Sequence, residues 1–192
     1  MEERNQTRFV ELWVKIATRY KNEPTVAAYD LLNEPLPERT GAFGKYHVQL
    51  EPLYRRVTEA IRAVDKKHMI TLEGGDWANN WSVFSNRFDD NLVYQFHYYC
   101  WDRPAKLNSI SKYLDERNRL GGPVWVGETG EKDNTIYWAT TDSFEANNIG
   151  WSFWPWKKMD SGNGPVSVKR PKHWDAVVEY SRGGEKPSSA SA

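Results

Sequence analysis

The chain has 192 residues, and its 26 lysines and arginines balance 26 aspartates and glutamates, so the formal net charge is zero. This balance argues against a nucleic-acid binder and against a polybasic membrane-surface protein, since both need an excess of positive charge. The mean hydropathy is −0.78, and no stretch approaches the roughly 18 apolar residues of a membrane-spanning helix. We therefore expect no nucleic-acid partner and no membrane partner.

The single cysteine, Cys100, excludes an intramolecular disulfide and a cysteine-based zinc site. The histidines do not fall at a metal-ligand spacing, so we expect no metal and no cofactor. The first residues carry no apolar segment, and we therefore expect no signal peptide in this chain.

Aromatic residues are unusually frequent, with ten tryptophans, ten tyrosines and seven phenylalanines. Many lie among polar residues, as Trp77 and Trp101 do, and such tryptophans can stack on sugar rings. Packing in the core explains aromatic residues equally well, because large rings dominate core burial. We expect the packing role for Trp13, Trp125 and Trp138.

Helical and strand patterns alternate along the chain. In chain order, we expect a helix over 6–20, a strand over 26–32, a helix over 46–67, a strand over 69–72, a strand over 92–96, a helix over 110–120, a strand over 123–126, a helix over 135–147, a strand over 149–153 and a helix over 171–180. Strands that are continuous apolar runs and that alternate with helices favour a parallel sheet covered by helices.

Two architectures share this pattern, an open doubly wound sheet and a closed (β/α)8 barrel. No glycine-rich phosphate loop follows any strand, which argues against the nucleotide-binding open sheet. Polar residues gather just after the strands, where a barrel has its active face. A complete barrel needs about 250 residues. The sequence therefore predicts a partial TIM barrel of five parallel strands over residues 1–180, without the first three βα units, and a flexible Gly/Ser/Ala-rich tail over 181–192.

The residues that follow the strands include two carboxylates on different strands together with a histidine, a tyrosine and tryptophans. They are Asn33, Glu34, Glu73, Asp76, His97, Tyr99, Glu128, Trp154 and Trp156. Cleavage of a glycosidic bond needs one carboxylic acid to protonate the leaving oxygen and a second carboxylate on the opposite side of the sugar. We interpret Glu73 and Asp76 as structural or substrate-bonding residues rather than catalysts.

Four segments resemble strands four, six, seven and eight of the family 5 glycoside hydrolases, the cellulase-like members of a retaining Glu/Glu barrel clan. They are residues 29–35 (YDLLNEP), 95–99 (QFHYY), 126–130 (VGETG) and 150–154 (GWSFW). The Asn-Glu-Pro motif is weak alone, but the four motifs occur in the family's order and at barrel spacing. The resemblance extends to about residue 180.

The resemblance implies a role for each matching residue. Glu34 matches the general acid/base, Glu128 matches the nucleophile, and Asn33 matches the asparagine that bonds the sugar 2-hydroxyl. His97 is expected near the acid/base and Tyr99 near the nucleophile. The further substrate-binding candidates are Trp154, Trp156, Trp101 and Trp77, of which Trp154 matches the aromatic floor of the subsite at the cleaved bond.

The family also has an arginine on its second strand and a histidine on its third, and neither strand is present here. Because that arginine supports the nucleophile, we expect Glu128 to be less well oriented and to have a raised pKa. A five-strand sheet also has two open edges, which invite pairing. A second copy of the chain, a separate N-terminal half or local disorder would each account for those edges.

The resemblance implies a retaining β-glycoside hydrolase that acts on a polysaccharide or oligosaccharide without a cofactor. The expected substrate is a β-1,4-glucan, with mannan and β-1,3-glucan as alternatives, and family habit places the protein outside the cell or in the periplasm. Two other interpretations stay open. The chain could be a catalytically silent sugar-binding remnant, or an inactive fragment whose sheet edges drive self-association.

Overall fold

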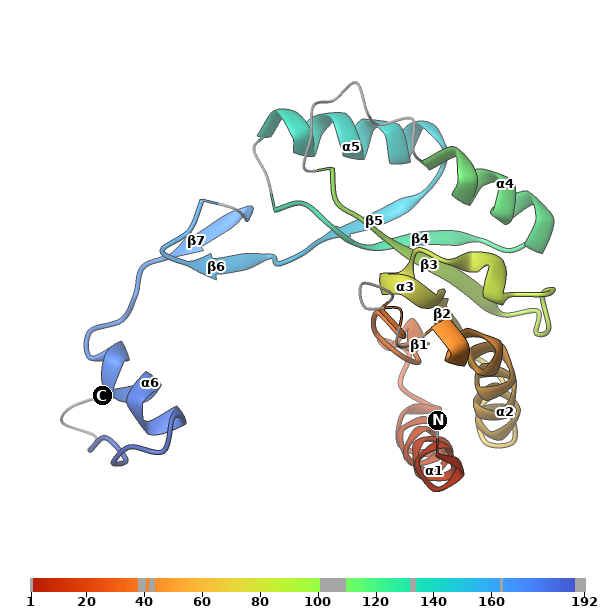
Figure 1. Ribbon diagram of the computed structural model, residues 1–192, viewed down its shortest axis with the longest axis horizontal. Coiled ribbons are helices and arrows are strands. Elements are labelled where there is room, and N and C mark those ends of the chain that lie inside the picture. The colour runs from red at the N-terminus through yellow and green to blue at the C-terminus, as the bar shows by residue number, and fades with distance from the viewer. Residues whose placement is uncertain are drawn as a thin grey trace.

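The computed structural model describes residues 2–37, 41, 44–100, 110–131, 134–162 and 164–188. Five parallel strands form one sheet in the order in which they occur along the chain. They are β1 (Ala28–Asp30), β2 (Met69–Glu73), β3 (Leu92–Tyr98), β4 (Val124–Thr129) and β5 (Gly150–Phe153). The sheet is curled, with helices on its outer side (Figure 1). The predicted partial barrel of five parallel strands is thereby confirmed.

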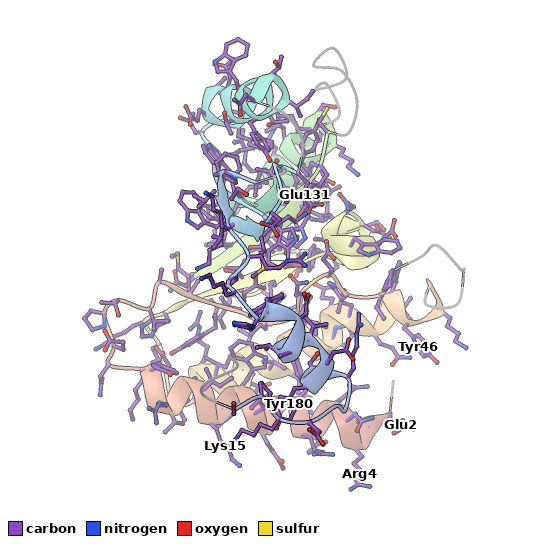
Figure 2. The ribbon with its side chains drawn as sticks, turned by 90° about the vertical axis from the view of Figure 1, so that its left-hand side faces the viewer. Glu2, Arg4, Lys15, Tyr46, Glu131 and Tyr180 are labelled. Atoms are coloured by element: carbon purple, nitrogen blue, oxygen red, sulfur yellow. The ribbon has the colours of Figure 1, made fainter. Side chains whose placement is uncertain are left out.

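Four long helices cover the sheet, namely α1 (Glu3–Tyr20), α2 (Leu50–Arg62), α4 (Ser111–Leu120) and α5 (Asn134–Ala146). In Figure 1, α1 and α2 lie against the β1 and β2 end, and α4 and α5 lie over β3 to β5. The polar face of α1 is turned outward, as the Arg4 and Lys15 side chains indicate in Figure 2. Shorter turns, η1 (Gly44–Gln49), α3 (Gly75–Ala78) and η2 (Trp81–Val83), fill the connections.

The core between the sheet and the outer helices is rich in aromatic rings. Phe96 of β3 stacks on Tyr113 of α4 with ring centroids 3.8 Å apart, and Trp81 contacts both rings. Trp81 is buried, so this tryptophan packs in the core. Trp13 also packs inward, because its indole N–H donates to the Leu31 carbonyl oxygen at 3.2 Å. The expected packing role of Trp138 is wrong, because it lies on the outer face of α5 and is 69% exposed.

A buried polar cluster joins the turn before β2 to β1. The Tyr29 hydroxyl donates to Asp65 Oδ2 at 2.7 Å, and His68 Nδ1 lies 2.5 Å from the same oxygen. The Lys67 backbone N–H donates to Asp65 Oδ1 at 2.8 Å. Burial alone would raise the pKa of Asp65, but these hydrogen bonds outweigh it and lower that pKa to about 2. The cluster lies at the N-terminal ends of the strands, away from Glu34 and Glu128.

After β5 the chain leads away from the sheet through β6 (Lys157–Met159), β7 (Val166–Val168) and α6 (Trp174–Ser181) (Figure 1). We call residues 157–188 the C-terminal arm. The β6–β7 pair was not predicted from the sequence, and α6 begins three residues later than expected. No residue of α6 is buried. Lys158 of β6 forms an ion pair with Glu131, which follows β4 (Figure 2).

Among the described residues no helix has the length and apolarity needed to cross a lipid bilayer.

Candidate active site

Glu34 lies four residues after the end of β1, in a turn with unusual backbone angles. Its φ is 43°, a left-handed value that is uncommon for a residue with a side chain and costs conformational energy. The turn is held by a hydrogen bond from the Glu34 backbone N–H to Oε2 of Glu73 at 2.6 Å. The Glu34 side chain is 29% exposed, and its Oε1 lies 2.8 Å from Nδ1 of His97.

Glu128 lies in β4 and is in register with His97 of β3. Its Oε2 accepts a hydrogen bond from the Tyr99 hydroxyl at 2.7 Å. The preceding residue is Gly127, where a Cβ atom would stand 2.3 Å from the side-chain amide of Gln95. A side chain at position 127 would therefore displace Gln95, so the glycine lets β4 approach the polar residues beneath Glu128.

His97 lies at the centre of the site, between three carboxylates. Nδ1 lies 2.8 Å from Oε1 of Glu34 and 3.4 Å from Oε2 of Glu128, and Nε2 lies 3.3 Å from Oε1 of Glu73. One oxygen of Glu34, one oxygen of Glu128 and one ring nitrogen of His97 all lie within 4.8 Å of one another. The fold thus brings together four of the predicted residues, namely Glu34, His97, Tyr99 and Glu128.

The charges of the site follow from this crowding. Burial by itself would lower the pKa of His97, but Glu73, Glu34 and Glu128 outweigh it and raise that pKa to about 9. His97 is therefore an imidazolium at neutral pH. Burial raises the pKa of Glu128, while the Tyr99 hydroxyl and the His97 charge limit the rise. The expected direction for Glu128 is confirmed, with burial as its largest cause.

Three further polar side chains form the floor of the site. Glu73 of β2 is fully buried, and Gln95 of β3 donates through Nε2 both to Glu73 and to Oδ2 of Asp30, the latter at 2.9 Å. Desolvation and the nearby Glu73 charge raise the pKa of Asp30 to about 6, although Asp30 is exposed at the open edge of β1, where water weakens the effect. Sequence reasoning missed Asp30 and Gln95. The sequence signal for both residues was a charged or polar side chain inside an otherwise apolar strand. Gln95 also lies two residues before His97.

The remaining predicted residues lie around this cluster. Asn33 is exposed, and its side chain makes no hydrogen bond to the described residues. Trp154 and Trp156 follow β5 and are 53% and 62% exposed, with the Trp156 ring 6.4 Å from that of Phe153. Trp77 is half-buried in α3. Trp101 lies outside the described residues.

Glu34, His97 and Glu128 also offer the donor atoms of a metal site. Binding of a cation through His97 requires the neutral imidazole, since a ligand nitrogen must be deprotonated. With a pKa of about 9, His97 opposes such binding at neutral pH. The arrangement is better suited to proton transfer and to charge stabilisation between two carboxylates.

The description "Cellulase (glycosyl hydrolase family 5)" belongs to a family model that matches residues 1–160 of this chain. The chain belongs to this family. An endoglycoceramidase of Hydra vulgaris is 27% identical over 85% of this chain and 35% of its own length. A beta-xylosidase of Phanerodontia chrysosporium is 29% identical over 86% of this chain and 40% of its own length. This family 5 chain therefore spans less than half the length of these two relatives.

Solved structures of the family share the fold. The endoglucanase Cel5A of Thermotoga maritima superposes with a TM-score of 0.69 at 22% identity, over 84% of this chain and 61% of that one. At this identity the likeness concerns the fold alone. The resemblance stated from the four motifs is thus confirmed at the level of family and barrel architecture.

Proposed function

We propose that this family 5 chain is a retaining β-glycoside hydrolase with Glu34 as acid/base and Glu128 as nucleophile. The observation that carries the proposal is the approach of the two carboxylates, which have oxygen atoms within 4.8 Å of each other at the ends of different parallel strands. Retaining enzymes have their two carboxyl groups about 5–5.5 Å apart, whereas inverting enzymes need at least about 6.5 Å to admit a water molecule. An approach of two carboxylate oxygens within 4.8 Å is compatible with the retaining arrangement, on which we base the proposed mechanism.

In the first step Glu128 attacks the anomeric carbon while a proton passes from Glu34 to the leaving oxygen. His97 lies against Glu34, with Nδ1 2.8 Å from Oε1, and so orients this carboxyl group. In the second step water attacks the glycosyl-enzyme, and Glu34 accepts the proton of that water. The Tyr99 hydroxyl, 2.7 Å from Glu128, orients the nucleophile and favours its ionised form.

The proposed substrate is a β-glucan, and among β-glucans a β-1,4-linked chain. The cellulase description of the family model supports this choice. The exposed rings of Trp154 and Trp156 offer apolar platforms beside the site, and the amide of Asn33 is exposed next to Glu34. The relatives are named for a glycoceramide and a xyloside, so a test of substrate must extend beyond glucan. Polysaccharides are too large to enter cells, and we therefore propose a location outside the cell or in the periplasm.

The test is hydrolysis of a chromogenic cellobioside and of soluble cellulose by the purified chain, beside Glu128→Ala protein as the contamination control. Xyloside, mannan, β-1,3-glucan and glycosphingolipid complete the panel. Turnover that disappears in Glu128→Ala supports the proposal. Equal background rates in both proteins would contradict it, and a sugar titration followed by tryptophan fluorescence would then separate a silent binder from an inactive fragment.

We infer that the two edge strands of the sheet, β1 and β5, are covered in the working molecule. Their outer edges are unpaired within the described residues, and exposed strand edges pair readily. The covering part is either an N-terminal half that supplies further βα units or a second copy of the chain. Sedimentation of the purified chain distinguishes the two, because a defined dimer supports the second copy and a monomer excludes it.

A further inference from the structure

We propose that Glu73 is a positioning residue for the Glu34–Glu128 pair, fixing the Glu34 backbone through one carboxylate oxygen and His97 through the other. Sequence reasoning considered Glu73 a structural or substrate-bonding residue. The structure excludes direct contact with a sugar, because Glu73 has no exposed surface. The predicted effect of Glu73 on kcat rests on the proposed function, whereas the predicted effect of Glu73 on the charge of His97 does not.

Both oxygens of the Glu73 carboxylate are occupied. Oε2 accepts the Glu34 backbone N–H at 2.6 Å, and Oε1 accepts from Gln95 Nε2 and lies 3.3 Å from His97 Nε2. Among the described residues no lysine or arginine pairs with Glu73. A buried carboxylate is costly without an opposite charge, so the imidazolium of His97 is its natural counter-ion.

The same contact determines the charge that His97 presents to the reacting carboxylates. His97 faces Glu73 of β2, Glu34 after β1 and Glu128 of β4, and Asp30 of β1 acts on it from further away. Glu73 is the strongest of the groups that favour the protonated ring. With Nε2 held by Glu73, the Nδ1–H of His97 is directed at Glu34 and Glu128.

Glu73 also supports the strained turn that presents Glu34. The left-handed backbone of Glu34 persists only where surrounding contacts enforce it. The hydrogen bond from the Glu34 N–H to Glu73 is such a contact, and it ties the proposed acid/base to β2 rather than to its own strand. A single buried side chain thus couples the position of Glu34 to the charge of His97.

Glu73→Gln separates charge from shape, because the two side chains are nearly isosteric. An amide cannot accept hydrogen bonds at both ends. If its oxygen keeps the Glu34 N–H, its NH2 group meets His97 Nε2, which then needs a lone pair and must lose its proton. The variant is therefore expected to convert His97 from imidazolium to the neutral Nδ1–H tautomer.

The first experiment follows the ring nitrogens of His97 by NMR during a pH titration of the full chain, which has only four histidines. In the parent chain we expect His97 to stay charged at neutral pH and to titrate near 9. In Glu73→Gln we expect it to be neutral at pH 7. An unchanged titration in Glu73→Gln would overturn the proposal, whether or not the chain has activity.

Glu51→Gln is the matched control. Glu51 of α2 is also buried, and its carboxylate accepts from the Ser85 N–H at 3.0 Å and from Arg55 at 2.8 Å. It has no contact with the site residues in the described part of the chain. The control also removes the charge of a buried carboxylate, and we expect the His97 titration to stay as in the parent chain. A shift of the same size in Glu51→Gln would also overturn the proposal.

The second experiment measures steady-state kinetics on the chromogenic cellobioside. We expect Glu73→Gln to lower kcat about 10- to 100-fold, as misplaced catalytic groups do, with KM little changed. Glu73→Asp, which keeps the charge, is the second variant if Glu73→Gln fails to melt cooperatively. We expect it to keep His97 protonated but to lower kcat, because the shorter side chain cannot reach both Glu34 and His97. Parental kcat in either folded variant would overturn the positioning role. Absence of turnover in the parent chain would instead count against the proposed function, while the NMR result still decides the role of Glu73.

Discussion

Environment, rather than residue type, distinguishes the carboxylates of this site. Glu128 receives the Tyr99 hydroxyl, Glu34 contacts the Nδ1 of His97, and Glu73 is buried beneath both. The three residues are chemically identical in the sequence. Their different partners are the basis for the different tasks that we propose for them, namely attack, proton transfer and positioning.

Tyr99→Phe tests the support that Tyr99 gives to Glu128, the proposed nucleophile. Loss of the hydroxyl removes one hydrogen bond to a charged group, which contributes about 1.5–3 kcal/mol, so we expect kcat/KM to fall about ten- to a hundredfold. The pKa of Glu128 should rise further, and the acidic limb of the pH–rate profile should move to higher pH. Tyr180→Phe, in the exposed α6, is the control. Equal kcat/KM in the parent chain and Tyr99→Phe would contradict this assignment.

His97 predicts a pH dependence of stability. Its folded-state pKa of about 9 lies above the ordinary 6.5, so the stabilisation is complete below about pH 6.5 and is lost as the pH rises through 9. Urea unfolding at intervals between pH 7 and 10 measures the decline. His97→Asn should show a shallower decline, because it lacks the imidazole that loses its proton. Some decline should remain, because tyrosines and lysines titrate in the same range. Identical slopes for the two proteins would count against a charged His97.

At the scale of the elements, the sequence predicted all five strands and the long helices to within a few residues. The strands were predictable because largely apolar runs such as 69–72 are buried between the helices and the barrel interior. The helices were predictable because their apolar residues recur on one face, as in α2. The β6–β7 strands escaped prediction because three-residue strands without buried side chains leave no pattern. Trp138 was misassigned because its residue type favours burial, and only the packing of α5 reveals its outward position.

The site was predicted in part for the same reason. Glu34, His97, Tyr99 and Glu128 follow or end strands, and the topology of a parallel sheet brings such residues to one edge. The contacts of Glu73, Gln95 and Asp30 depend on which side chains face inward and on the bulge between Phe96 and His97. No local pattern specifies those contacts.

The turn between α2 and β2 depends on Asp65, and Asp65→Ala tests this dependence. Removal of one partner of a buried charged cluster costs about 3–5 kcal/mol, and we expect a loss of that size in the free energy of unfolding. Because the folded-state pKa of Asp65 is about 2, its stabilisation is present above pH 3.8 and is lost as the pH falls through 2. Asp142→Ala, exposed on α5, is the control. A loss no larger than that of the control would exclude the role given to the cluster.

At the scale of the whole molecule, the chain divides into a packed half-barrel and a C-terminal arm with little burial. The aromatic core lies wholly between the sheet and its outer helices, whereas no residue of α6 is buried (Figure 1). The proposed chemistry is located at the carboxyl ends of β1 and β4, within the packed part. We therefore expect removal of α6 to leave the stability of the half-barrel nearly unchanged.

A chain that ends at residue 170, which lacks α6 but keeps β6 and β7, tests this expectation. Because no residue of α6 is fully buried, we expect the free energy of unfolding to change by no more than about 0.5 kcal/mol, as for substitutions on a surface. Phe144→Ala, in the core face of α5, is the positive control and should cost about 3–5 kcal/mol. Thermal and urea unfolding measure both. A loss in the truncated chain that approached the Phe144→Ala value would mean that α6 packs on the half-barrel.

The central claim is that Glu128 forms a covalent bond with the sugar, and trapping of that bond tests it most directly. A 2-deoxy-2-fluoro-β-cellobioside with a dinitrophenyl leaving group needs no acid catalyst and slows breakdown of the glycosyl-enzyme. Intact-mass analysis followed by peptide mapping should find one sugar per chain, attached to Glu128 and absent from Glu128→Ala. Turnover of the parent cellobioside with an adduct on another residue, or with none, would contradict the account.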